Sequence, residues 1–360
     1  MSHQVTVDFE GVSIKIQAQC ESATKSLCKI DKTINLIRQT ASKVETKAIK
    51  EYEQYLLDSK RQIQSQIDIV YSKLDEYKSL KRQVLSFNTQ SKWINLNQAI
   101  RVEAQKLQNL ANELTGSKLE VINQMVNDSL LDKIDELRAN LLGIKTFDQD
   151  LLNKINSIDD VSLRELAFFQ MNNGLSDFDL ILSNAQKEYD KILGKSSVVE
   201  EIKEELKKSG ISTEEIAQIT SKPINAKTLN QITQEANDAI VDEKVRKETL
   251  KVIIKSIKDR GFIVDTKNNL KIDKKTNIVK LVAQKPDGKK AEFEISLNGK
   301  FMYHFDGYEG QACQKDITPF IDDLENIYDI NILRKEVIWS NPDKIQAKKY
   351  QQINSNKNKN

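Results

Sequence analysis

A regular apolar seam in the first third of the chain limits what it can fold into. Its first run has alternating spacings of four and three residues and consists of Ile30, Ile34, Ile37, Ala41, Val44 and Ala48. A second run, which includes one lysine, consists of Ile63, Ile67, Val70, Leu74, Tyr77, Lys81 and Val84. Neither Pro nor Gly occurs between residues 12 and 115. A repeat near 3.5 keeps one stripe facing a neighbouring helix, so long paired helices are predicted.

The seam alone does not decide which helix pairs with which. The pattern indicates helix from 18 to 87, with a slip of the seam between residues 48 and 63. Further helices are expected over residues 93–114, 119–142, 147–169, 175–193, 198–208 and 226–258. The first of these should stop at Gly116. Short connections favour an antiparallel bundle within one chain, and a parallel homodimer through the seam remains the alternative.

The hydrophobic period changes from helical to alternating near residue 261. Candidate strands cover 262–264, 270–272, 278–284, 291–297, 301–305 and 330–339, with a helix over 317–327. Pro286-Asp287-Gly288 and Asn298-Gly299 are strong turn signals between the middle strands. The predicted fold class is therefore α+β: a long helical or coiled-coil bundle followed by a small antiparallel sheet-plus-helix domain.

Five segments follow from these patterns. Residues 5–16 alternate around Glu10-Gly11 and predict an N-terminal hairpin, which needs a surface to dock on because a lone hairpin is marginal in water. The expected domains are the hairpin (1–17), a helical coiled-coil bundle (18–194), a helical connector (195–260), an α+β head (261–342) and a disordered basic tail (343–360).

Composition argues against several classes of function. The chain has 55 Lys and Arg against 53 Asp and Glu, which gives no global attraction to nucleic acid or an anionic membrane. Its three cysteines, at 20, 28 and 313, have no metal spacing and suggest a reducing, cytoplasmic setting. No apolar stretch approaches the roughly 20 residues that span a bilayer, and the N-terminus does not read as a secretion signal.

Few residues suggest chemistry. Cys313 and His304 are the single His–Cys combination close in sequence, but His304 is expected on the strand face opposite Phe301, Tyr303 and Phe305. His3 is expected in an unstructured start, and Gly194-Lys195-Ser196 lacks the earlier glycine of a phosphate loop. No catalytic residue, cofactor or metal ligand is therefore predicted. A Lys-rich run in the head leaves nucleic-acid binding as an alternative, although acidic residues offset it.

One part of the head resembles a known family. The turn at 286–288, the segment from Gly307 through Gly310 to Cys313, and the helix with Thr318 near its start resemble a small family of unknown function. Its members are short bacterial and plastid-related proteins, often encoded beside an AAA+ ATPase of the MoxR-like kind. The likeness covers residues 278–338 and implies a partner-binding role without known chemistry.

These observations predict a non-enzymatic adaptor or scaffold. The helical stalk would set distance or oligomer state, and the head would dock on a protein, with an AAA+ ATPase as the partner that the resemblance suggests. The alternatives are a nucleic-acid-associated structural protein and a thiol-dependent enzyme that uses Cys313. In the leading interpretation Gly307 and Gly310 adopt positive φ angles at a strand-to-helix bend, and Cys313 is a buried anchor.

Overall fold

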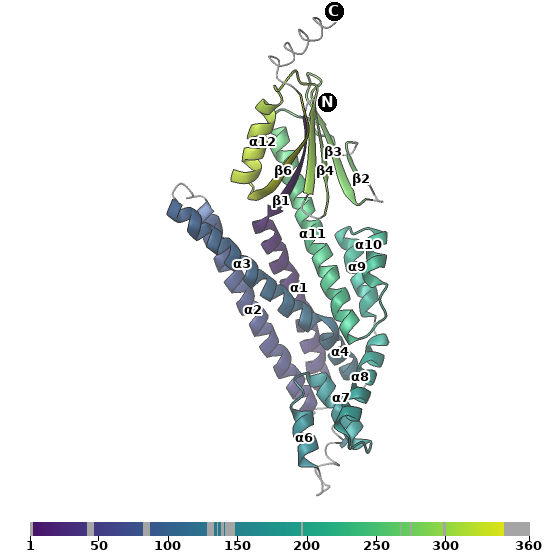
Figure 1. The fold of residues 1–360 in the computed structure, drawn as a ribbon. Helices are drawn as coiled ribbons and strands as arrows, with labels where there is room; N and C mark the ends of the chain where they lie inside the picture. Colours follow the sequence, from purple (N-terminus) through teal and green to yellow (C-terminus); the bar gives the residue numbers. More distant parts are fainter. Residues whose placement is uncertain are drawn as a thin grey trace, which may run out of the picture. The chain divides into compact units, whose positions relative to one another are not determined.

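The computed structural model divides the chain into two compact units. The helical unit comprises residues 19–240, and the sheet unit comprises residues 1–18 and 241–360 (Figure 1). The structure describes residues 3–41, 47–81, 87–127, 133–134, 136–137, 140, 148–195, 197–266, 268–273, 276–297 and 300–341. The fold class is α+β, as predicted. The expected connector is not separate, because its residues are divided between the two units.

The long first helix of the prediction is a helical hairpin. Ion pairs join helix α1 (Val12–Ala41) to helix α2 (Lys47–Lys81). A residue later in α1 pairs with a residue earlier in α2. Asp31 Oδ1 is 2.5 Å from Lys60 Nζ, and Arg38 Nε is 2.7 Å from Glu53 Oε1. The two helices are therefore antiparallel. The slip inferred between residues 48 and 63 lies inside α2 and not between the two helices.

The seam is buried within the single chain. The buried positions are Ile34 and Ile37 in α1, and Ile63, Ile67, Val70 and Leu74 in α2. Val44 and Val84 lie outside the described residues. Tyr52 and Leu56 are also buried, so the seam runs unbroken along α2. The seam thus needs no second chain to cover it, which agrees with an intramolecular bundle.

A third helical segment lies parallel to α1. It consists of α3 (Phe87–Glu113), the π-helical turn η1 (Leu114–Lys118) and α4 (Leu119–Asn127). The predicted end of the helix at Gly116 is confirmed, because the backbone kinks there and a separate helix, α4, begins at Leu119. Gly116 has non-helical backbone angles, and the next residue, Ser117, donates its N–H to Asn230 Oδ1 at 2.9 Å. A Cβ at Gly116 would lie 2.3 Å from that oxygen, which explains the glycine.

Polar pairs cross the interior of the helical unit. Gln19 Nε2 donates to Gln108 Oε1 at 2.6 Å, and Gln108 Nε2 donates to Asp238. Asn237 Nδ2 donates to Asn112 Oδ1 at 2.6 Å. Asp238 and Asn237 belong to α11 (Ala226–Lys258), whose first half packs antiparallel to α3 in this unit. Buried amides accept few alternative neighbours, so these pairs help to specify the order and register of the helices.

The remaining helices begin and end close to their predicted turn signals. Asp177 Oδ1 accepts from Leu180 N at 2.8 Å and caps α8, and Ser212 Oγ accepts from Glu215 N and caps α10. The helix expected over 147–169 is split, because Asp160 caps a new start. The bounds are α6 (Gln149–Asn156), α7 (Val161–Asn172), α8 (Phe178–Gly194), α9 (Val198–Ser209) and α10 (Thr213–Thr220).

The sheet unit contains a six-stranded antiparallel sheet with the order β2-β3-β4-β5-β1-β6. The predicted meander is present at its centre, and the bend at Gly288 has a φ of +88°. The turn expected at 298–299 lies outside the described residues. The strands are β1 (His3–Gly11), β2 (Leu270–Asp273), β3 (Ile278–Gln284), β4 (Lys290–Ile295), β5 (Lys300–Asp306) and β6 (Ile330–Ser340).

The predicted N-terminal hairpin is wrong. Residues 3–11 form the single strand β1, which lies between β5 and β6, and Val12 begins helix α1. Asp329 Oδ2 accepts from the Ser13 backbone N–H at 3.3 Å and so caps the start of this helix. Val12 and Ile16 are buried and lie four residues apart on this helix. Their β-branched, alternating appearance imitates a strand, but the four-residue spacing belongs to the helix.

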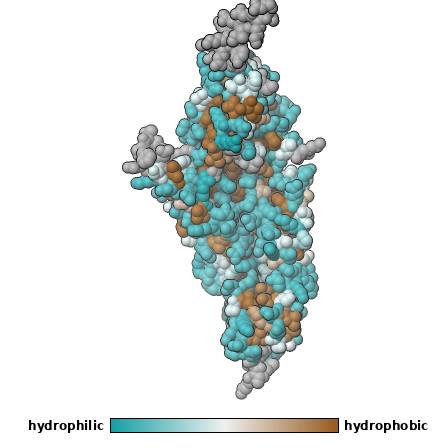
Figure 2. Space-filling model, viewed as in Figure 1, coloured by the Kyte–Doolittle hydropathy of each residue, from teal (hydrophilic) through white to brown (hydrophobic). Residues whose placement is uncertain are grey.

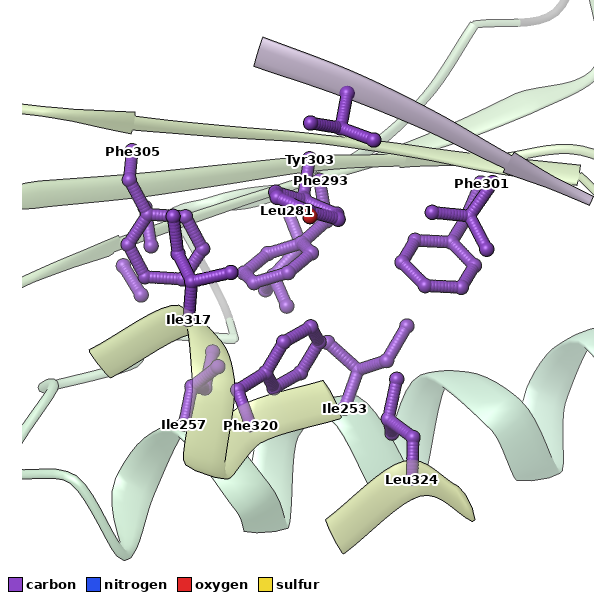
Figure 3. Packing of buried hydrophobic residues seen from close by; sticks show 14 of the residues in the cluster. Ile253, Ile257, Leu281, Phe293, Phe301, Tyr303, Phe305, Ile317, Phe320 and Leu324 are labelled. Atoms are coloured by element: carbon purple, nitrogen blue, oxygen red, sulfur yellow. The ribbon is translucent and has the colours of Figure 1, made fainter. Parts of the chain in front are cut away.

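The core of the sheet unit lies between one sheet face and two helices. Figure 3 shows Phe293, Phe301, Tyr303 and Phe305 on the sheet facing Ile253 and Ile257 of α11 and Phe320 of α12 (Gln314–Asn326). All these side chains are buried, and the Phe293 and Phe320 rings have centroids 5.4 Å apart. Helix α12 starts earlier than predicted, so Pro319 lies inside it rather than in its first turn.

Candidate functional site

The motifs that carried the family resemblance come together in space. Gly307 follows β5 with a φ of +82°, and a Cβ there would lie 3.2 Å from the Cα of Lys289, just after the 286–288 turn. Gly310 also has a positive φ, of +56°. Both angles agree with the expectation of a strand-to-helix bend. The close approach of two backbones shows why Gly307 has no side chain.

Asp316 ties this loop to the turn. Its Oδ2 accepts from the Tyr308 hydroxyl at 2.5 Å and lies 2.7 Å from Lys285 Nζ. The lysine ammonium also lies 4.7 Å from the centre of the Phe262 ring. Burial, together with the hydrogen bond to Asp316, raises the pKa of the Tyr308 phenol well above its usual range. These charged groups satisfy one another, and their visible role is to hold the loop, the turn and α12 together.

Cys313 is a core residue rather than an exposed nucleophile. It immediately precedes α12, makes no side-chain cap hydrogen bond and is 1% exposed. A helix start can lower a thiol pKa, but burial outweighs this influence and raises the pKa of Cys313. A buried thiol with a raised pKa forms little thiolate at neutral pH. The arrangement therefore agrees with Cys313 as a packed anchor.

The two histidines lie on opposite faces of the sheet. His304 pairs with Gln4 and Glu292 on the face away from the core, where its Nδ1 is 3.8 Å from Glu292 Oε2. It does not approach Cys313, which is buried in the core. His3 was expected in an unstructured start, but it begins β1 and its buried ring lies 6.2 Å from that of Tyr303. Burial lowers the pKa of His3.

Three lysines of the Lys-rich run in the sheet unit pair with acidic side chains. Lys280 lies 2.7 Å from Glu294, and Lys289 lies 2.6 Å from Asp287. Lys285 is the lysine bound to Asp316. Lys274 and Lys275 lie outside the described residues. A phosphate-tracking surface needs cations that point away from local acids, and these three lysines are engaged with acids.

The outer strand β6 has the largest concentration of exposed apolar side chains in the sheet unit. Leu333, Val337, Ile338 and Trp339 are between 49% and 66% exposed. Figure 2 shows brown, hydrophobic surface around a hydrophilic patch in the region where Figure 1 draws β6. Among the described strands none lies beyond β6, so its outer backbone groups face no strand. Such an edge is a template for another extended chain.

The sequence predicted strand 330–339 but not its exposure. Strand β6 lies at the edge of the sheet because β1 inserts between β5 and β6. The predicted N-terminal hairpin does not place β1 there, so it does not predict the exposure of β6. The sequence did contain one signal of this exposed edge: three consecutive charged residues, 334–336, interrupt the apolar residues of the strand. Thr318, the other motif residue, is exposed on α12, whereas Leu324 of the same helix packs into the core.

Comparisons with protein families, with curated proteins and with solved structures found no match to this chain. Within the described ranges, none of the helices has the length and apolar character needed to cross a membrane. The same ranges contain no group of His, Cys, Asp and Glu arranged to hold a metal ion.

Proposed function

We propose that this protein is a non-enzymatic adaptor or scaffold that acts in the cytoplasm. Its helical unit is the structural part, and its sheet unit, which corresponds to the expected head, binds protein. The observation that carries the proposal is the exposed edge of β6. The AAA+ ATPase suggested by the family resemblance is the protein with which we expect the scaffold to work, and no residue is assigned to that contact.

Strand β6 offers two kinds of interaction to a protein segment. Its outer backbone groups can form a ladder of hydrogen bonds, and its apolar side chains gain free energy when they leave water. Burial contributes roughly 25 cal/mol for each Å² of apolar surface, and this contribution is not screened by salt. By contrast, Cys313 is buried and Lys285 and Tyr308 are engaged with Asp316. The surface therefore favours binding over chemistry.

The proposal can be tested by capturing proteins from the native host with the full tagged chain. Val337→Lys places a charge in the exposed apolar stretch of β6, and we expect it to reduce the amount of protein retained at least tenfold, equivalent to about 1.4 kcal/mol. Binding by the wild-type chain should persist at moderate salt. Recovery of an AAA+ ATPase with the wild-type chain would support the partner that the resemblance implies.

Ile272→Lys is the matched control, because Ile272 is 58% exposed on β2, the opposite edge strand. It should leave retention unchanged. Equal retention by wild type and Val337→Lys would contradict the proposal. So would an enzymatic activity that is lost when Cys313 is alkylated without a change in the melting temperature. Tight binding of nucleic acid that is lost when Lys289 and Lys290 become Glu would favour the nucleic-acid alternative.

A further inference from the structure

The two edges of the sheet differ in how they are protected. Strand β2 has four residues, and short edge strands offer little to a neighbouring chain. Strand β6 has eleven residues, and all of those from Leu333 to Ser340 are exposed. An edge of this length with apolar side chains on it is an unusual surface for a chain that remains alone. Its sequence indicates which partner it suits.

The side chains of β6 are arranged symmetrically around Lys335. Arg334 and Glu336 flank it with opposite charges, and their side chains approach to 3.5 Å within the strand. On either side of them stand two apolar pairs, Ile332-Leu333 and Val337-Ile338. Read in either direction from Lys335, the order is one charge followed by two apolar residues, with the sign of the charge reversed. A strand with this order is complementary to its own antiparallel copy.

A two-fold axis perpendicular to the sheet makes this complementarity explicit. Two antiparallel copies of β6 centred on Lys335 place Arg334 opposite Glu336 of the second copy, twice. The same register brings the apolar residues Ile332 and Leu333 of one copy alongside Val337 and Ile338 of the other. Moving the centre to Arg334 or Glu336 puts Lys335 opposite Leu333 or Val337 and removes the charge pairing. Opposite charges and apolar residues in facing positions both stabilise a pair of strands.

The backbone of β6 is regular where this pairing would be centred. Residues 334–337 pair in step with Asp8 through Val5 of β1. The register shifts lie outside this run, and they leave Leu333 and Ile338 between paired positions. Lys335 faces its own copy, which costs some free energy, but the long exposed side chains can diverge into solvent.

We propose that the occupant of the β6 edge is a second copy of this chain, joined through antiparallel β6–β6 pairing centred on Lys335. The inference rests on the proposed function, since it names the partner of the same protein-binding edge. The product is a symmetric dimer with one continuous sheet shared by two sheet units. The apolar seam of the helical unit takes no part, because it is already buried in each chain.

Sedimentation of the full chain across the micromolar range tests the dimer. Wild type and Ile272→Lys should sediment as dimers, and Val337→Lys should shift the equilibrium to monomer at least tenfold. A wild-type chain that remains monomeric throughout would overturn the inference. If Val337→Lys nevertheless lost a different protein in the capture experiment, the proposed function would stand. If that capture were also unchanged, both would fail.

Charge reversal tests the symmetry. Arg334→Glu alone places Glu opposite Glu at two positions and should weaken the dimer, and Glu336→Arg should weaken it similarly by placing Arg opposite Arg. The double variant R334E/E336R restores opposite charges across the axis and should recover the wild-type dissociation constant. Circular dichroism should show the same helical signal in all three variants. A double variant as weak as the two single changes combined would overturn the charge pairing.

Cross-linking tests the register. The Cys28→Ser background removes the exposed native thiol. In this background, Lys335→Cys places one cysteine of each copy at the axis, with their Cβ atoms about 4.5–5.5 Å apart, near the range that a disulfide bridges. Mild oxidation should yield a disulfide-linked dimer from Lys335→Cys and none from Ile272→Cys. Equal cross-linking of both variants, or a dimer that does not cross-link through position 335, would overturn pairing centred on Lys335.

Discussion

The interiors of the two units are built from different side chains. The sheet unit encloses an aromatic cluster with Phe293, Phe301, Phe305 and Phe320 at its centre. The helical unit buries an apolar seam together with polar pairs such as Gln19 with Gln108. This difference reflects how each kind of secondary structure fixes its neighbours.

Strands are aligned by their backbone ladder. A one-residue slip turns every side chain to the other face, so an apolar core already specifies the register. Helices satisfy their backbone internally, and an apolar stripe of similar residues packs on several partners in several registers. The amide contacts between α1, α3 and α11 supply the missing specificity, because a mispaired arrangement leaves buried polar groups without partners. The comparison yields predictions for each unit.

The largest expected effect is a charge placed in the seam. Ile67 is 4% exposed, and Ile67→Asp should lower the free energy of unfolding by about 3–5 kcal/mol because the carboxylate has no buried partner. Ile69, two residues along the same helix, is 41% exposed, so Ile69→Asp should change stability by less than about 0.5 kcal/mol. Chemical denaturation of the full chain measures both. Equal effects would show that α2 does not bury this face.

A smaller loss should follow from removing one polar contact. Gln108→Leu leaves the buried Gln19 amide without its partner in α3, and should cost about 1–3 kcal/mol despite the added apolar surface. The matched control is Gln105→Leu, because Gln105 is exposed on the same helix. Urea titrations of the full chain compare the two. A stabilised Gln108→Leu protein would remove the argument that polar pairs specify the bundle.

The sheet unit should tolerate loss of its cysteine. Cys313→Ser exchanges a packed thiol for a hydroxyl and should lower the free energy of unfolding by about 1 kcal/mol. Exposed Cys28 should react with a thiol reagent rapidly in the folded chain, and Cys313 should react only on unfolding. Mass spectrometry of the modified chain distinguishes these sites. Faster reaction at Cys313 would mean that the thiol is accessible and would reopen the enzymatic alternative.

The smallest effect concerns pH. Burial lowers the pKa of His3 in the folded chain below its unfolded value of about 6.5. Between these two values the unfolded chain binds more protons, so stability is complete above pH 6.5 and declines as the pH falls toward the folded pKa. His3→Gln should flatten this part of the curve, and His304→Gln should leave the His3 contribution in place. Thermal melts across a pH series measure the slope.

Local patterns predicted much of the sheet unit. Strand 278–284 is matched residue for residue by β3, and the Pro286-Asp287-Gly288 turn lies where it was placed. Short-range rules suffice here because alternation and turn chemistry are properties of neighbouring residues. The same rules placed the boundaries of α8, α9 and α11 within a few residues.

These short-range rules do not predict which helices and strands pair across long stretches of sequence. The sequence determined that the first third of the chain is helical and buries one stripe, because that stripe recurs every three or four residues. Only the tertiary structure decided that α1 and α2 fold back on each other, and that β1 inserts between strands more than 290 residues away. That insertion makes β6 an edge. The physical reason is that edge and interior strands have similar local patterns, while their hydrogen-bond partners come from distant segments whose choice depends on the whole fold.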